Sequence, residues 1–161
     1  SNILTKKIKK IALLTVVVLC TLFIFYNSSK TGNVSNGITC KIARKLVGIK
    51  QTIDPGPISY EVIGRVNVII RNIAHGVEFC ILAIAIQFFS NTLKRRKKNW
   101  IITIFIIISL AVSDEISQLF VDGRNFSYLD MIIDSIGGAI GIILIETISY
   151  IKRKIILYES I

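Results

Sequence analysis

The stretch Asp114–Asp134, with the sequence DEISQLFVDGRNFSYLDMIID, decides how the chain folds. It holds five of the ten acidic residues and lies between two long apolar runs. A membrane span that ends in Asp-Glu is costly to insert, so such residues usually face the interior of a helix bundle or a wet cavity. We therefore interpret the rest of the chain as a frame that holds this stretch at one face of a membrane.

The composition favours a membrane protein. Of the 161 residues, 52% are hydrophobic, and they come in long blocks with few charges, which is typical of membrane spans. The net charge is +10, but the basic residues gather at the ends of the blocks without interleaved aromatic residues, so no nucleic-acid partner is predicted. The three cysteines include no Cys-x-x-Cys pair, and neither a disulfide framework nor a zinc-thiolate site is predicted.

The apolar runs predict one membrane domain over residues 1–161, with four transmembrane helices at about 11–26, 66–89, 100–120 and 130–151. The first run follows four lysines and also fits a signal peptide, but the absence of a small-residue cleavage site after it favours a retained span.

A further helix is predicted between the first two spans. Ile38, Ile42, Leu46 and Ile49 recur there at helical spacing among basic residues. This pattern indicates an amphipathic helix, which either lies at the membrane surface or packs over the mouth of the bundle.

The basic clusters predict the orientation. They precede the first span, join the second to the third and follow the fourth, so the positive-inside rule places both termini in the cytoplasm. Residues 27–65 and 121–129 are then extracellular; the first of these loops is itself basic, but its length weakens the rule. The predicted fold is an all-α integral membrane protein with four spans and an amphipathic surface helix in the first extracellular loop. Gly137-x3-Gly141 in the last span allows close helix packing, and a homo-oligomer through this face is a further hypothesis.

Polar residues of three predicted spans fall at one depth. Arg71, His75 and Glu78 occupy positions i, i+4 and i+7, so they share one helical face. With a rise of about 1.5 Å per residue, they lie within roughly three turns of the outer surface, as do the acidic ends of the third and fourth spans. The candidate catalytic residues of this predicted polar pocket are His75, Glu78, Asp114, Glu115, Gln118 and Asp130.

Several chemistries fit this set. Carboxylates near His75 could act as a general acid and base. A divalent metal is a second hypothesis, because histidine with carboxylates suits Zn, Mn or Fe; its candidate ligands are His75, Glu78, Asp114 and Glu115. Arg71 and Arg124 are candidate substrate-binding residues, since guanidiniums clamp phosphates or carboxylates.

A purely structural interpretation stays open beside these. The arginines could simply neutralise carboxylates and lock the helices together. Asp130 could cap the amino end of the last span. Glu146, near the other end of that span, is expected at most to make a hydrogen bond between helices.

These motifs resemble those of the VanZ-like family of bacterial membrane proteins. The likeness covers Tyr26 to Ile145 and includes a polar segment at Asn27–Ser35. It departs from the family pattern at Asp134, where that pattern has Asn. The matching features are Arg71-x3-His75-x2-Glu78, Asp114-Glu115-x2-Gln118, Gly123-Arg124, Asp130 and Gly138-x2-Gly141.

The resemblance implies a multi-pass protein of the bacterial plasma membrane, associated with resistance to teicoplanin-type lipoglycopeptides. Together with the charge pattern it predicts an outward-facing polar pocket among membrane lipids. The pocket would bind or modify an anionic envelope polymer or a lipid-linked cell-wall precursor. The alternatives are a non-enzymatic binder or shield of the antibiotic target, a small lipid or proton-coupled transporter, and a structural subunit of a larger complex.

Overall fold

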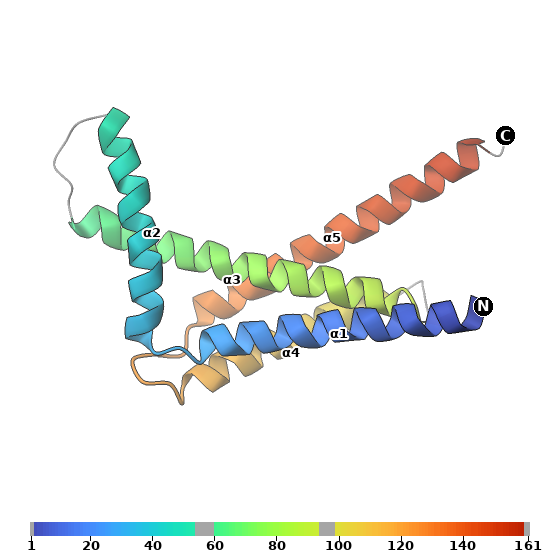
Figure 1. Cartoon of the computed structure of the whole chain (residues 1–161), viewed down its shortest axis with the longest axis horizontal. Coiled ribbons are helices and arrows are strands. Elements are labelled where there is room, and N and C mark those ends of the chain that lie inside the picture. The colour runs from blue at the N-terminus through green and yellow to red at the C-terminus, as the bar shows by residue number, and fades with distance from the viewer. Residues whose placement is uncertain (1, 54–59, 94–98, 160–161) are drawn as a thin grey trace.

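The computed structural model of the chain describes residues 2–53, 60–93 and 99–159. These residues form α-helices and contain no strand (Figure 1), so the predicted all-α class is confirmed. The helices are α1 (Asn2–Ser28), α2 (Gly32–Ile53), α3 (Tyr60–Ser90), α4 (Asn99–Gln118) and α5 (Tyr128–Glu159).

Four of the described helices are long and apolar enough to cross a membrane. The candidate spans in α1, α3, α4 and α5 have 26, 31, 20 and 31 residues. Because a helix of about 20 residues is roughly 30 Å long, even α4 matches the hydrocarbon thickness of a bilayer. Several helices run beyond the predicted spans: α1 includes Lys6–Lys10 and α5 continues past Lys152–Lys154. Lysine and arginine end an apolar run without ending a helix, since both favour helical backbone.

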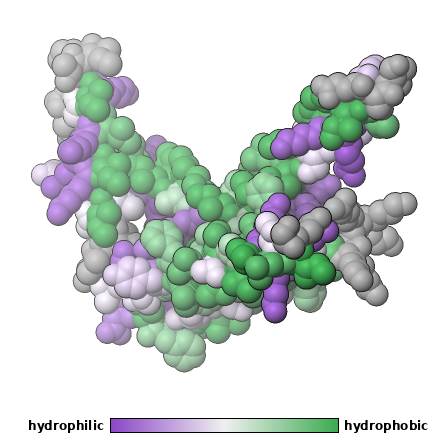
Figure 2. Space-filling model, turned by 45° about the vertical axis from the view of Figure 1, so that its right-hand side comes forward, coloured by the Kyte–Doolittle hydropathy of each residue, from purple (hydrophilic) through white to green (hydrophobic). Residues whose placement is uncertain are grey.

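The bundle is built around α3, which packs against α1, α2, α4 and α5. Its buried apolar face meets residues of three other helices in one core: Ile24, Phe79, Leu82, Ala83, Ile86, Ile107, Ala111 and Ile142. Many other large apolar side chains are exposed, and Figure 2 shows them over much of the central surface, with polar side chains gathered toward α2 and the end of α5. Such a continuous apolar surface is expected of a protein that faces lipid.

Helix α2 lies at one end of the bundle that the other helices form. In Figure 1, α2 lies across the direction of α1 and α3, near the end of α1 and the loop between α4 and α5. The start of α1 and the end of α5 both lie at the opposite side of the molecule, apart from each other. The predicted helix is therefore present, and Ile38, Ile42, Leu46 and Ile49 are all exposed on it. Its place at the membrane surface and the cytoplasmic position of the termini remain predictions.

The glycines of α5 allow a close helix crossing. Gly137, Gly138 and Gly141 are buried. A Cβ atom at Gly137 would collide with the backbone carbonyl of Gly76, and one at Gly141 would lie 2.5 Å from the carbonyl oxygen of Cys80. The close packing expected from these glycines thus occurs between α5 and α3 of one chain. A homo-oligomer through α5 remains a prediction, and it would need another face of that helix.

Polar side chains also cross the bundle near the start of α4. The amide of Gln87 donates to Glu146 at 2.6 Å, and the hydroxyl of Thr103 donates to Gln87 at 2.5 Å. The hydrogen bond between helices that was expected for Glu146 is therefore present, and it ties α3, α4 and α5 together.

Candidate functional site

The structure brings the predicted polar residues together at one end of the bundle. We call this region the mouth: the ends of α1 and α4, the starts of α2 and α5, the α4–α5 loop and the part of α3 that faces them. Its polar residues come from separate elements and are linked by side-chain contacts: Asn27, Ser28, Arg71, His75, Glu78, Asp114, Glu115, Gln118, Arg124, Asp130 and Asp134.

The face of α3 predicted from its spacing meets a different partner at each level. Arg71 pairs with Asp130 of α5 at 3.4 Å. One turn further along, Nδ1 of His75 lies 3.4 Å from Asp134 of α5. Glu78 accepts a hydrogen bond of 2.8 Å from the amide of Asn27 at the end of α1. Because of their helical spacing, a guanidinium, an imidazole and a carboxylate follow one another along one face of α3.

The carboxylates of α4 have separate roles. Asp114 is fully buried, and its Oδ2 accepts hydrogen bonds from Ser28 at 2.8 Å and from Gln118 at 3.0 Å. Glu115, also fully buried, accepts one from the backbone N–H of Ser127 at 2.8 Å and another from Gln118 at 3.2 Å. Glu115 thus holds the segment that leads into α5.

The residue that caps the amino end of α5 is Ser127 and not Asp130, which the sequence had suggested. Oγ of Ser127 accepts a hydrogen bond of 3.1 Å from the backbone N–H of Asp130. Ser127 therefore occupies the capping position and Asp130 lies in the first turn. Serine suits this position because its short hydroxyl reaches the third free N–H of the helix. The carboxylate of Asp130 is left to pair with Arg71.

Arg124 lies where the turn between α1 and α2 contacts the loop between α4 and α5. The N–H of Gly32 donates to the carbonyl of Asp122 at 3.2 Å, and Gly123 adopts a φ of 74°, a conformation that glycine accepts without strain. The guanidinium of Arg124 donates to the carbonyl of Lys30 and to Oε1 of Gln118, both at 3.3 Å. Burial and then the nearby charge of Arg71 lower the pKa of Arg124. An anion between the two guanidiniums would relieve this repulsion.

A cavity of about 230 Å³ opens among these elements. Its polar lining includes three basic side chains, Lys30, Arg71 and Arg124, together with His75 and Glu78. Its apolar lining comes from α2 and α3. The lining residues are Asn27, Ser28, Lys30, Ile38, Thr39, Ile42, Ile70, Arg71, Ala74, His75, Glu78 and Arg124. Of the predicted site residues, Asp114, Glu115, Gln118 and Asp130 do not line this cavity.

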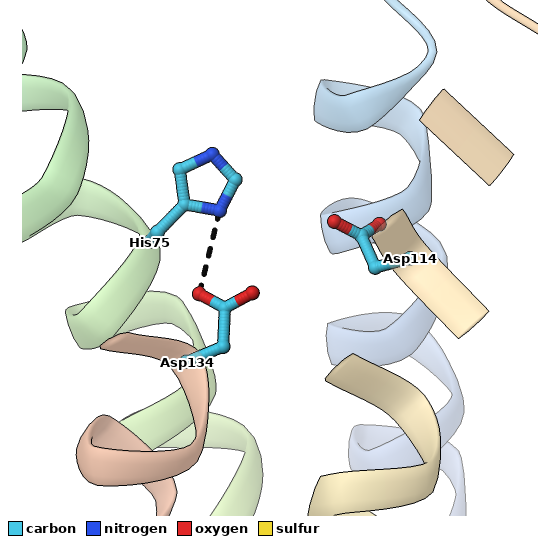
Figure 3. A group of neighbouring side chains, drawn as sticks. All are labelled: His75, Asp114 and Asp134. Carbon is cyan, nitrogen blue, oxygen red and sulfur yellow. Dashed lines mark ion pairs between the residues drawn. The ribbon is translucent and has the colours of Figure 1, made fainter. Parts of the chain in front are cut away.

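Three of these residues form a compact group with metal-ligating atoms. One potential ligand atom from each of His75, Asp114 and Asp134 lies within 4.8 Å of the other two, and all three residues are buried. Figure 3 shows the imidazole of His75 and the carboxylate of Asp134 close together, with the carboxylate of Asp114 across from them. Glu78 and Glu115, two of the four ligand candidates from sequence, are outside this group and bind Asn27 and Ser127 instead.

Some residues of the mouth were absent from the sequence-based set. Asp134 follows Asp130 by one helical turn and so shares its face, a signal that the spacing already contained. Asn27, Ser28 and Lys30 follow an apolar run, and nothing in their spacing indicated that Asn27 would reach α3, that Ser28 would reach α4 or that Lys30 would line the cavity. Only the fold brings them there.

The comparisons with known proteins support the family resemblance. The family model described as VanZ/LLP1 matches residues 12–149, which extend from α1 into α5. No curated protein and no solved structure matches the chain. The match covers most of the chain and, with the four candidate spans, indicates a multi-pass membrane protein. The chain belongs to the VanZ/LLP1 family.

Proposed function

We propose that the protein binds an anionic, phosphate-bearing lipid of the bacterial cell envelope in the cavity at the mouth, and that this binding underlies resistance to lipoglycopeptides. The observation that carries the proposal is the lining of the cavity, where Lys30, Arg71 and Arg124 meet an apolar wall. Cations beside a hydrophobic surface suit a ligand with a charged head and a hydrocarbon tail.

The head would bind to the arginines. Guanidiniums hold phosphate oxygens by paired, charge-assisted hydrogen bonds. Arg71 is engaged with Asp130 through only one nitrogen, Nη2, and its buried Nε has no hydrogen-bond partner among the described residues. Asp130 therefore acts as a positioning residue that orients Arg71. Lys30 donates to Asn27 at 3.1 Å, which holds a third positive charge beside the cavity.

The tail would lie along the apolar wall. Ile70 and Ala74 of α3 and Ile38 and Ile42 of α2 line the cavity. Ile38 and Ile42 are also about half exposed, at 49% and 45%, so the wall continues onto the outer surface of the bundle. A lipid could therefore enter sideways, with its tail still in the membrane. The orientation predicted by the positive-inside rule would put this entrance at the outer leaflet, where lipid-linked cell-wall precursors are available.

Binding alone could shield the lipid-linked target from the antibiotic. A second candidate, chemical modification of the lipid, is favoured by one observation: His75 lines the cavity and also contacts a buried carboxylate. The two differ in their dependence on the carboxylates. A shield requires the arginines but tolerates Asp114→Asn, whereas acid, base or metal chemistry loses its function with that change.

We expect production of the protein in a susceptible bacterial host to lower teicoplanin susceptibility, and Arg71→Gln or Arg124→Gln to abolish this effect at equal membrane levels. Both changes remove a charge from the cavity and keep a polar, although shorter, side chain. The measurement is the minimum inhibitory concentration. Arg65→Gln is the matched control, because Arg65 is an exposed arginine of α3 that pairs with Glu61 away from the cavity. Full resistance in both cavity variants would contradict the proposal.

A further inference from the structure

His75, Asp114 and Asp134 meet deep in the mouth although they belong to α3, α4 and α5 (Figure 3). Asp114 and Asp134 are 0% exposed and His75 is 8% exposed. Two carboxylates in such an environment are unfavourable unless a cation or several hydrogen-bond donors compensate their charge. The group therefore needs a source of positive charge.

Hydrogen bonds within the chain supply little of that compensation. Among the described residues, no hydrogen-bond partner is found for Nδ1 of His75, for Oδ1 of Asp114 or for either carboxylate oxygen of Asp134. Ser28 and Gln118 both donate to Oδ2 of Asp114 and so leave its other oxygen free. These unpartnered, buried atoms belong to the three residues that face one another.

The nearest arginines are directed elsewhere. Arg71 contacts Asp130, and Arg124 donates to Gln118 and to the carbonyl of Lys30. The contact between His75 and Asp134 is long, at 3.4 Å, and Oδ1 of Asp114 has no hydrogen-bond partner among the described residues.

We propose that His75, Asp114 and Asp134 bind one divalent first-row transition metal ion. One imidazole nitrogen and two carboxylate oxygens suit Zn²⁺, Mn²⁺ or Fe²⁺ better than Mg²⁺ or Ca²⁺, which prefer sites composed of oxygen. A neutral imidazole and two carboxylates carry a charge that a divalent ion cancels. Ser28 and Gln118 then orient the Asp114 ligand, as partners of metal ligands commonly do.

The geometry is close to what such an ion requires. Bonds of about 2.0–2.2 Å to Zn²⁺ place the ligand atoms of a tetrahedral site about 3.4 Å apart. His75 and Asp134 already have this spacing, and the ligand atoms of all three residues lie within 4.8 Å. Small side-chain rotations therefore complete the set. Three protein ligands would leave a coordination position free, and one of the three, His75, also lines the cavity.

The test uses the full chain, purified in detergent, stripped with a chelator and reloaded with Zn²⁺, Mn²⁺ or Fe²⁺ separately. We expect about one ion per chain by elemental analysis for at least one metal, and a higher thermal unfolding temperature in its presence. Asp114→Asn and Asp134→Asn are expected to weaken metal binding at least about tenfold, the loss that even partners of ligands can cause.

Two variants act as controls. Asp122→Asn changes an exposed carboxylate of the α4–α5 loop and should bind metal like the original chain. Asp134→His replaces one ligand with another and should retain Zn²⁺ where Asp134→Asn does not. Equal metal content in the original chain and in Asp134→Asn would overturn the inference.

Cobalt supplies a readout that needs no variant. Co²⁺ bound by one nitrogen and two carboxylates in the original chain should give visible d–d absorption that Zn²⁺ abolishes. Absence of this signal, together with no stoichiometric metal, would overturn the inference. The site does not depend on the proposed function, because lipid binding by the arginines can fail while metal binding succeeds, and the reverse.

Discussion

Replacing Gly137 with alanine is expected to lower the free energy of unfolding by about 1–3 kcal/mol or more, the usual cost of overpacking a well-packed interior. The added Cβ would collide with the backbone carbonyl of Gly76. A carbonyl within a helix cannot rotate away, so α3 and α5 would have to separate. This separation would weaken the core around Phe79 and pull Asp134 away from His75.

The matched control for this change is Gly64→Ala. Gly64 lies in α3, the helix that packs against α5, but a Cβ there would meet nothing within 4 Å among the described residues. Alanine favours a helix by about 1 kcal/mol relative to glycine, so this variant should be as stable as the original chain or more stable. Thermal unfolding in detergent measures both. Equal unfolding temperatures for Gly137→Ala and Gly64→Ala would show that the close α3–α5 crossing is wrong.

The double variant Arg71→Gln/Arg124→Gln is expected to bind a polyprenyl phosphate about a hundredfold more weakly than the original chain. Charge-assisted hydrogen bonds contribute about 1.5–3 kcal/mol each, and each factor of ten in affinity corresponds to about 1.4 kcal/mol. We take the lower end of this range because Arg71 is 31% exposed and solvent screens its charge. Lipid vesicles that contain the phosphate provide the binding measurement.

The control for this double variant removes two positive charges at positions away from the cavity. Arg65→Gln/Arg153→Gln changes two exposed arginines of α3 and α5 that do not line the cavity at the mouth. We expect this variant to bind the lipid with nearly unchanged affinity. An equal loss in both double variants would indicate general attraction between a basic protein and an anionic vesicle, and would contradict a specific site.

The sequence predicted the membrane helices well because each is an apolar run of sufficient length. It predicted their ends less well: Lys6–Lys10 and Lys152–Lys154 are helical although they are charged. Hydropathy reports which residues prefer lipid, whereas the backbone of a helix continues wherever its hydrogen bonds can form. The helix at Gly32–Ile53 was also predicted, since its isoleucines recur with helical spacing.

The arrangement of the site was likewise predicted only in part. Spacing along α3 correctly placed Arg71, His75 and Glu78 on one face. Which carboxylate meets each of them depends on the rotation and depth of α4 and α5, and these are set by glycine packing that spacing alone does not specify. Asp134 was therefore not chosen as a ligand candidate, although it lies one turn from Asp130.

Binding of a phosphate-bearing lipid at the mouth is tested most directly with two lipids that differ only at the head. Native mass spectrometry of the purified chain would be run with a polyprenyl phosphate and with the polyprenol of the same length. We expect the chain to retain the phosphate and to release the alcohol, because Arg71 and Arg124 bind the phosphate oxygens. Equal retention of both lipids would contradict this expectation, since the apolar wall alone would then account for binding.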